Sequence, residues 1–424
     1  MNKNSKRYLN FFIRTFQNFY NFFSWKLFNS TEKLKAKHID YILDENLNYR
    51  KDFVDFSDEK FVLNDKMTKL ISFYLPQFYE NETNNKYFGK GFMEWYNTSK
   101  CIPQFTGHYQ PQIPYDVGFY NLTHDDIMYR QIELAKSYGI YGFCFYYYWF
   151  SGDRLLEKPL DNFLKNKELD MPFCLFWANE TWRNLWGNTT SNQIIKQQEL
   201  LDGDEVKFAE DILKYFKDER YIKIDNAPLL IIYQVGLFET KKFKLFLDYL
   251  RQYVKKEGFR DICILVTDTR IGEFDINTLD LDGVVEFGHN NMRDTSIDSL
   301  LDMRNRFVNP NFKGRVIDVK KGLKKGNHLK ENKYKTYRCV CAGWDNSSRK
   351  AYTGAEIFYM TPEDYKLWLE DSILWTKNNC SANSQFVFVD SWNEWAEGAH
   401  LEPDQKYGYA YLDATREILK KTNF

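Results

Sequence analysis

The 424-residue sequence has almost no net charge and lacks the motifs by which many proteins hold nucleic acids or nucleotides. Its formal charge is −1, and it contains neither a glycine-rich phosphate loop nor a basic recognition helix. One Asp-x-Asp pair, Asp280 and Asp282, precedes a predicted strand, whereas the metal motif of a nucleotide-sugar site would follow one. We therefore expect no nucleic-acid partner.

Cysteine is scarce and scattered. The seven cysteines, an odd number, lie mostly inside apolar runs, which is typical of reduced core residues. Cys339 and Cys341 form a C-x-C pair, but no second pair or nearby histidine completes a zinc site. The sequence therefore predicts neither a metal site nor a cofactor.

The N-terminal part lacks both a secretory signal and a run apolar enough to span a membrane. Residues 7–28 carry aromatic side chains at near-helical intervals with polar residues between them, and no small-residue cleavage site follows. With Arg14 and Lys26, this segment fits an amphipathic helix lying in a membrane surface. It fits a helix docked on the protein itself or on a partner equally well. The expected location is the cytoplasm, at the inner face of the membrane if residues 7–28 bind lipid.

Aromatic residues are abundant, at 18% of the chain, and apolar runs recur at intervals from residue 69 onward. The runs lie at residues 70–78, 141–149, 173–178, 229–234, 262–267, 283–287, 339–344 and 386–390. Helical periodicity between them is clearest at residues 125–138, 205–216, 241–257 and 362–377. Apolar strands alternating with helices indicate a parallel sheet covered on both faces, and eight units close into an α/β fold of the (β/α)8 TIM-barrel type. A doubly wound open sheet is the alternative. We assign residues 66–424 to the barrel and residues 1–65 to an extra N-terminal helical segment.

The last run is followed by the densest cluster of reactive side chains in the sequence. Residues 386–389 are β-branched and aromatic, and the chain then turns polar. Glu394 and Glu397 lie three positions apart, a spacing that puts both carboxyls on one side of a helical turn or tight loop. Two carboxyls that share a site separate into a proton donor and a proton acceptor, so we predict that this pair is catalytic. A capped helix start with two solvated glutamates and two core tryptophans fits the spacing equally well.

Polar and aromatic side chains also follow several other runs, and the carboxyl ends of barrel strands meet at one face. Glu180 follows the third run and is the rival candidate for the acid, while Glu94 is expected to hold a hydroxyl or Arg183. Indole, amide and carboxylate side chains in one cavity suit a polyhydroxylated substrate. The residues expected to bind it are Glu94, Trp95, His108, Tyr146, Trp149, Trp177, Asn179, Glu180, Trp182, Arg183, Trp344, Asp345, Trp392, Asn393, Trp395 and His400.

Five long motifs lie in these patches: FYLPQFYENETNNKYFGKGFMEWYN, GHYQPQIPYDVGFYNL, CLFWANETWRNLW, GWDNSSR and WNEWAEGAHLEPDQKYGYAYL. Through these motifs the sequence resembles the WbsX proteins, glycosyltransferases of surface-polysaccharide gene clusters that are also described as similar to glycoside hydrolase family 99. The resemblance covers residues 69–412 and implies a (β/α)8 barrel with a metal-free site. It also implies the route of the retaining endo-mannosidases of family 99, which act through a 1,2-anhydro sugar. In that route Glu394 removes the proton of the 2-hydroxyl, and Glu397 is the acid or base at the leaving oxygen.

The leading prediction is an enzyme of O-antigen or capsule-type assembly that makes or remodels a glycosidic bond. An endo-acting glycoside hydrolase is the first alternative, because one site serves both reactions if either water or a sugar hydroxyl reaches the intermediate. A non-catalytic glycan-binding barrel is the second. The expected partner is an oligosaccharide or polysaccharide, free or lipid-linked.

Overall fold

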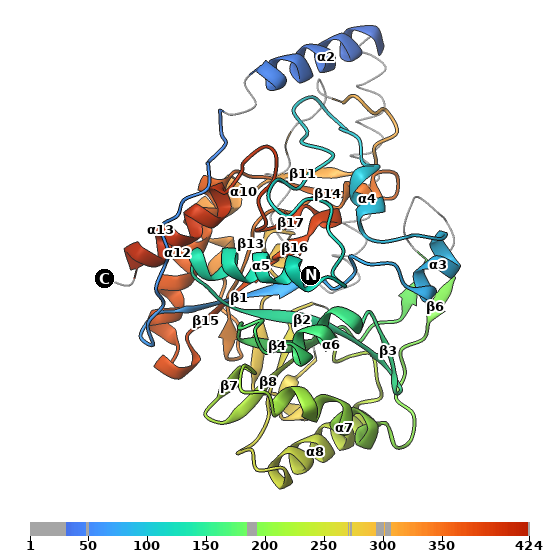
Figure 1. Ribbon diagram of the computed structural model, residues 1–424, viewed down its shortest axis with the longest axis vertical. Helices are drawn as coiled ribbons and strands as arrows, with labels where there is room; N and C mark the ends of the chain where they lie inside the picture. Colours follow the sequence, from blue (N-terminus) through green and yellow to red (C-terminus); the bar gives the residue numbers. More distant parts are fainter. Residues whose placement is uncertain are drawn as a thin grey trace.

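The computed structural model describes residues 31–47, 51–184, 193–269, 271, 274–293, 301 and 307–422. The predicted membrane-surface segment, residues 7–28, lies outside the described residues. Helix α2 (Thr31–Leu47) projects beyond the barrel at the top of Figure 1. None of the helices within the described ranges is long and apolar enough to cross a membrane.

Eight parallel strands close into a barrel, so the predicted (β/α)8 fold is confirmed. The strands are β1 (Lys69–Tyr74), β2 (Ile140–Phe150), β4 (Phe173–Trp177), β8 (Ala227–Ile232), β9 (Cys263–Thr267), β10 (Gly283–Val285), the interrupted seventh strand β12 (Thr336–Tyr337) and β13 (Cys339–Cys341), and β15 (Phe386–Asp390). Their order is β12-β10-β9-β8-β4-β2-β1-β15-β13. Because β12 and β13 belong to one run of sequence, their pairing at the two ends of this order closes the sheet (Figure 1).

Arg338 interrupts the seventh strand at the point where the strand changes neighbour. Its side chain is fully buried, Nη1 donates to Glu286 Oε1 at 2.5 Å, and the guanidinium lies 3.9 Å from the ring centre of Trp375. A buried charge needs such a partner, because an isolated one would be strongly destabilising. The contacts of Arg338 with Glu286 and Trp375 therefore hold the break between β12 and β13 at this position.

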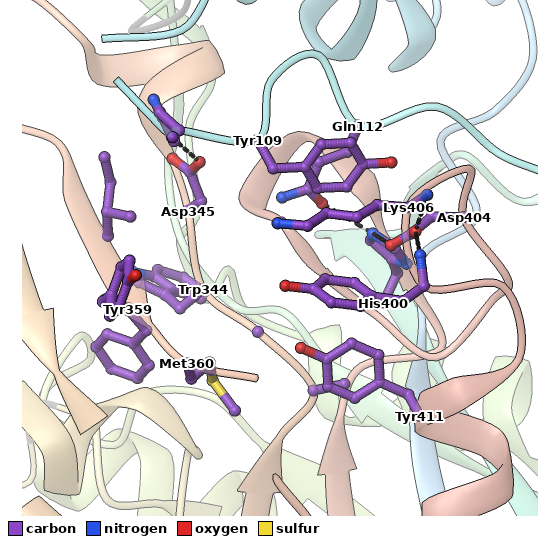
Figure 2. Close-up of a pocket in the computed structure, with 18 of the residues that line it drawn as sticks. Tyr109, Gln112, Trp344, Asp345, Tyr359, Met360, His400, Asp404, Lys406 and Tyr411 are labelled. Carbon is purple, nitrogen blue, oxygen red and sulfur yellow. Dashed lines mark hydrogen bonds and ion pairs between the residues drawn. The ribbon is translucent and has the colours of Figure 1, made fainter. Parts of the chain in front are cut away.

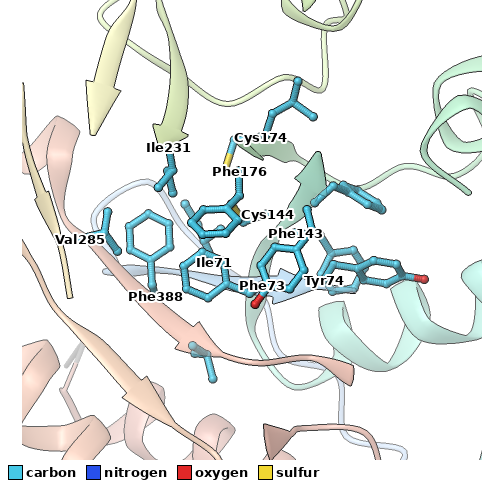
Figure 3. Packing of buried hydrophobic residues seen from close by; sticks show 14 of the residues in the cluster. Ile71, Phe73, Tyr74, Phe143, Cys144, Cys174, Phe176, Ile231, Val285 and Phe388 are labelled. Atoms are coloured by element: carbon cyan, nitrogen blue, oxygen red, sulfur yellow. The ribbon is translucent and has the colours of Figure 1, made fainter. Parts of the chain in front are cut away.

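The barrel interior is filled by aromatic side chains (Figure 3). The ring of Phe73 on β1 lies 5.3 Å from that of Phe176 and 5.6 Å from those of Phe287 and Phe388. All of these side chains are buried. Burying one phenylalanine stabilises a fold by roughly 1.5–3 kcal/mol, so this cluster contributes a large part of the stability of the barrel core. Open space remains at the carboxyl ends of the strands.

Helices surround the barrel, and the four that the periodicity predicts, at residues 125–138, 205–216, 241–257 and 362–377, are present. The longer ones are α5 (Asp125–Ser137), α6 (Lys158–Lys165), α7 (Asp204–Phe216), α8 (Thr240–Lys256), α12 (Pro362–Asn379) and α13 (Ala410–Thr422). Between β9 and β10 the described residues form only a 3-10 turn, η1 (Ile276–Leu279). The shorter elements are α3 (Glu82–Phe88), α4 (Trp95–Ser99), β3 (Asp153–Leu155), β5 (Trp182–Arg183), β6 (Ile194–Lys196), β7 (Lys223–Ile224), α9 (His289–Arg293), β11 (Arg315–Asp318), α10 (Val319–Lys324), η3 (Asn327–Leu329), α11 (Ser347–Lys350), β14 (Glu356–Tyr359), η4 (Ala382–Ser384), β16 (Asn393–Glu394), η5 (Trp395–Glu397) and β17 (Ala399–His400).

Part of the predicted N-terminal segment packs on the barrel. Val54 forms a β-bridge with Gly408, and Arg416 on α13 donates to the carbonyl oxygen of Glu59 at 2.6 Å. The chain before β1 is therefore tied to the last helix, which is itself packed against α12 (Figure 1).

Candidate active site

A cavity of about 470 Å³ lies at the carboxyl ends of the barrel strands. Its lining includes residues from the end of every strand, which is where enzymes with this fold keep their sites. The lining residues are Leu75, Gln77, Tyr146, Tyr148, Phe176, Ala178, Glu180, Thr181, Trp182, Arg183, Ile195, Tyr233, Thr269, Phe287, His289, Asn290, Trp344, Arg349, Lys350, Glu394 and Glu397. Aromatic rings and polar side chains make up most of this lining, which suits a polar ligand with apolar faces.

A tight hairpin after β15 delivers the predicted glutamate pair to this cavity. β16 pairs with β17, and η5 connects them. Ser391 Oγ accepts from the backbone N–H of Glu394 at 2.9 Å and donates to the carbonyl oxygen of Ala399 at 2.8 Å. Gly398 ends the turn with φ of 60°, a conformation that glycine adopts without strain. The spacing of three therefore reflects a closed turn, and not the start of a solvated helix.

Arg349, on α11, joins the pair to a third carboxylate. Its Nη1 lies 2.7 Å from Glu397 Oε1, and its Nη2 lies 3.6 Å from Glu394 Oε2. Nε and Nη2 also donate to Glu94 Oε1 at 3.0 and 2.6 Å. The side chains of Arg349 and Glu94 are 11% and 0% exposed. One guanidinium thus faces three carboxylates, and a single positive charge cannot neutralise all of them.

The surplus of carboxylates favours protonation in this cluster. Burial raises the pKa of Glu394 well above its ordinary value, the charge of Glu397 adds to the shift, and Arg349 opposes it. Burial also raises the pKa of Glu94, against the opposing effect of Arg349. Glu394 Oε2 makes no hydrogen bond to any described residue. The cluster therefore binds a proton at pH values where an exposed glutamate is ionised.

A buried carboxylate, Glu402, holds the glutamate hairpin in place. Its Oε1 accepts from Trp392 Nε1 at 3.1 Å and from Gln131 Nε2 at 2.6 Å. Its Oε2 accepts from Trp395 Nε1 at 2.7 Å and from Tyr120 Oη at 2.9 Å. The two tryptophans of the hairpin therefore anchor it to the barrel through their indole N–H groups.

Replacing Glu402 by glutamine should change how stability depends on pH. Burial raises the pKa of Glu402 from 4.5 to about 7. Because the carboxyl binds its proton more tightly in the folded chain, its protonation stabilises the fold. This stabilisation is fully present below the pKa of 4.5 in the unfolded chain and is lost as pH rises through the folded-state pKa of about 7. The parent should therefore lose about 3 kcal/mol of unfolding free energy relative to Glu402→Gln between about pH 4 and pH 8. Urea denaturation across this range measures the difference. Glu210→Gln, on the exposed face of α7, should follow the parent, and a Glu402→Gln difference that is constant with pH contradicts the prediction.

The structure brings only part of the predicted site together. Besides the glutamate pair, the large cavity is lined by Tyr146, Glu180, Trp182, Arg183 and Trp344. A smaller cavity beside it is lined by His108, Asp345 and His400, and also by Trp344. The sequence predicts that Glu94 holds either a substrate hydroxyl or Arg183. In the structure its ion-pair partner is Arg349. The remaining predicted residues line neither of these two cavities; they are Trp95, Trp149, Trp177, Asn179, Trp392, Asn393 and Trp395.

Those remaining residues have structural contacts instead. Trp149 and Trp177 pack against Phe208 on the outer side of the barrel, with ring centroids 5.0 and 4.6 Å away. Trp95 is buried and donates to a backbone carbonyl, as the hairpin tryptophans do to Glu402. Asn179 exchanges hydrogen bonds with the backbone of residue 234, and Asn393 with that of residue 75. Each asparagine thus joins the end of one strand to the end of the next.

Several cavity residues that the sequence did not single out follow the middle strands and the seventh. Tyr233, Thr269, His289 and Asn290 come after β8, β9 and β10. His289 Nδ1 lies 3.2 Å from Asp390 Oδ2, and its ring stacks on Trp344 with centroids 3.7 Å apart. Applying the strand-end rule to runs four to six would have found them. Arg349 closes the GWDNSSR motif, but nothing in that motif indicates three carboxylate partners.

The structure places the chain in the class of closed (β/α)8 barrels, and its last strand presents paired glutamates to an aromatic-lined cavity. The chain belongs to the family described as glycosyltransferase WbsX, whose model matches residues 70–415.

Comparison with known proteins gives relatives in sequence and in fold. The chain is 36% identical over 352 residues to each of two proteins named "Uncharacterized protein WxcX", from two strains of Xanthomonas campestris pv. campestris. The match covers 83% of this chain and 50% of those proteins, so the chain spans about half the length of these curated relatives. A solved "Glycoside hydrolase-like protein" shares the fold, with a TM-score of 0.51 at 14% identity, covering 88% of this chain and 99% of that one. An endo-alpha-mannosidase of family 99 from Bacteroides thetaiotaomicron gives a TM-score of 0.49 at 14% identity, covering 85% and 98%.

Proposed function

We propose that this protein makes or remodels a glycosidic bond during assembly of a cell-surface polysaccharide of the O-antigen or capsule type, with Glu394 and Glu397 as its acid–base pair. The observation that carries the proposal is that Arg349, at the wall of the cavity, is shared by Glu394 and Glu397 of the lining and by the fully buried Glu94. Family membership supports the sugar substrate. The aromatic lining supports it too, because flat rings pack on the C–H faces of sugars.

The environments of the two carboxyls suit different tasks. Glu394 is buried and its pKa is raised, which makes its ionised form a stronger base than an ordinary glutamate. We assign it to the proton of a sugar hydroxyl. The side chain of Glu397 is 21% exposed, contacts Arg349 through Oε1 and lines the cavity. We assign it to the glycosidic oxygen, as the proton donor in one direction and the acceptor in the other.

Activity should rise as pH rises through the raised pKa of Glu394. Only the ionised carboxylate accepts a proton, and burial together with Glu397 keeps Glu394 protonated beyond the ordinary glutamate range. The pH dependence of kcat/KM should therefore have an acidic limb displaced to higher pH than an exposed carboxyl would give. Glu394→Gln should remove this limb from the residual activity, and Glu210→Gln should keep it. If the acidic limb of the kcat/KM profile survives in Glu394→Gln, the group that titrates there is not Glu394, and the prediction is contradicted.

The reaction is tested by incubating the full chain with lipid-linked oligosaccharide, with and without nucleotide sugars, and analysing the products by mass spectrometry. A product lengthened only in the presence of a nucleotide sugar indicates a transferase that uses that donor. Shortened or rearranged glycan without one indicates the endo-hydrolase or a remodelling enzyme. Binding of glycan without turnover under any condition would overturn the proposal and favour a glycan-binding barrel.

The same assay separates catalysis from binding. Glu394→Gln and Glu397→Gln should retain glycan binding and lose turnover, because each amide keeps the size of the side chain and removes its proton chemistry. Glu210→Gln should match the parent in both measurements.

A further inference from the structure

The smaller cavity is a built pocket that the proposed reaction leaves unused. It has a volume of about 100 Å³, and Trp344 borders both it and the large cavity. Its walls come from the loop after β1, the segment after β13, β14 and the stretch from η5 to α13 (Figure 2). A single water takes about 10–15 Å³ of such space, so the pocket holds a group about the size of one sugar ring.

One wall presents aromatic rings, and the facing wall combines polar side chains with tyrosine rings. In Figure 2, Trp344 and Tyr359 lie on one side of the gap, and Gln112, Lys406 and Tyr411 lie across from them. The side chain of Tyr359 is accessible, with 48% of the residue exposed. The Nζ of Lys406 lies over the rings of two tyrosines, at 5.3 and 4.8 Å from their centroids, which restricts it to this wall. A ring with an apolar face and polar edges matches both walls at once.

The charged groups behind the walls are held by the protein. The backbone N–H of Gln104 donates to His108 Nδ1 at 2.9 Å, so Nε2 carries the proton and donates to Asp345 Oδ2 at 2.6 Å. Asp404 Oδ1 accepts from the backbone N–H groups of Lys406 and Tyr407 at 2.8 and 2.7 Å. These bonds fix the pocket before any ligand enters it, which lowers the cost of ordering on binding.

The pocket is also joined directly to the glutamate hairpin. The backbone N–H of Asp345 donates to the carbonyl oxygen of Glu397 at 2.5 Å. Gly343 and Gly398 approach so closely that a Cβ on Gly343 would lie 2.3 Å from the carbonyl oxygen of Gly398. The position of the pocket relative to the acid pair is therefore set by the backbone.

We propose that the smaller cavity binds one sugar residue of the substrate, next to the residue that reacts at Glu394 and Glu397. The inference rests on the proposed function, since it takes the occupant of the large cavity to be a saccharide. Trp344, which borders both cavities, then lies between two consecutive sugars. The minimal well-bound substrate is accordingly a glycan of at least two units, and not a single sugar.

The test is calorimetric titration with size-fractionated fragments of the surface polysaccharide of the cell that makes the protein, in a Glu394→Gln background that prevents turnover. Fragments of two or more units should bind about tenfold more tightly than the single sugars, the contribution of one stacked and hydrogen-bonded residue. Tyr359→Ala and Lys406→Gln should abolish this gain and keep the affinity for single sugars. Lys256→Gln, an exposed substitution on α8, should keep the gain.

The outcomes separate this inference from the proposed function. A length-dependent gain that persists in both Tyr359→Ala and Lys406→Gln overturns the pocket assignment and leaves the proposed function standing. If no fragment binds and the parent turns over no glycan, the proposed function fails, and the pocket assignment fails with it. Thermal unfolding of each variant shows that a lost gain does not arise from a lost fold.

Discussion

Glu397→Gln is expected to lower kcat by about 10²–10⁴-fold on a natural glycan, the usual contribution of a positioned general acid or base. The loss should shrink on a substrate with an activated leaving group, such as a dinitrophenyl glycoside, because that group departs without a proton. Glu394→Gln should lower kcat by a similar factor on both substrates, because the proton it takes belongs to the sugar and not to the leaving group. Comparing the two ratios of kcat assigns acid and base.

Two results would reverse this assignment. If the loss in Glu394→Gln shrinks with the activated leaving group while that in Glu397→Gln does not, the roles of the glutamates are exchanged. If Glu180→Gln shows the leaving-group effect instead, the rival acid at the end of β4 is the proton donor. Glu180 lines the same cavity, so the comparison is made within one site.

Arg349→Met is expected to lower the free energy of unfolding by about 3–5 kcal/mol, the cost of removing one partner from a buried ion pair. The guanidinium is 11% exposed and faces Glu94, Glu394 and Glu397. Without it, the carboxylates must take up protons or remain buried with their charge. The midpoint of urea denaturation measures the loss, which should be smaller at acidic pH because protonation relieves the uncompensated charge.

An exposed ion pair is the control for this loss. Arg260, 69% exposed, lies 3.5 Å from Asp225, and Arg260→Met should cost less than about 1 kcal/mol. Combining Arg349→Met with Glu94→Gln should recover part of the stability, because the most deeply buried of the three charges is then absent. A double variant no more stable than Arg349→Met would show that the arginine acts through packing and not through charge.

The barrel could be predicted from the sequence because its strands are buried on both faces. Such strands appear as continuous apolar runs, and the eight runs of the sequence correspond to the eight barrel strands. Because both faces of each strand are apolar, the sequence does not show which side chains point into the barrel and which point toward the helices. Tyr146 and Tyr148 line the cavity, whereas Tyr147 and Trp149 point outward to Phe208 on α7. The alternation is regular, but its phase is invisible when both faces are apolar.

The glutamate pair was predictable for a different reason. Polar residues that directly follow a buried strand lie at one face of a barrel, whatever the conformation of the loops. The position of Glu394 and Glu397 could therefore be predicted from the apolar strand before them. The sequence predicts that Trp392 and Trp395, on either side of Glu394, bind substrate, because indole rings suit sugars. In the structure their N–H groups are bound by Glu402, a contact that depends on the path of the chain through residue 402.

The amino-acid sequence was enough to predict the closed barrel and the position of Glu394 and Glu397 at the carboxyl ends of its strands, because both follow from the order of the apolar runs and the residues next to them. The folded chain alone shows that Arg349 joins the glutamate pair to Glu94, 255 positions before Arg349, and that Trp344 borders two cavities. A charge cluster and a cavity wall depend on distances between segments that are not neighbours in the sequence. Local pattern specifies which face a segment buries and carries no information about the segment it will meet.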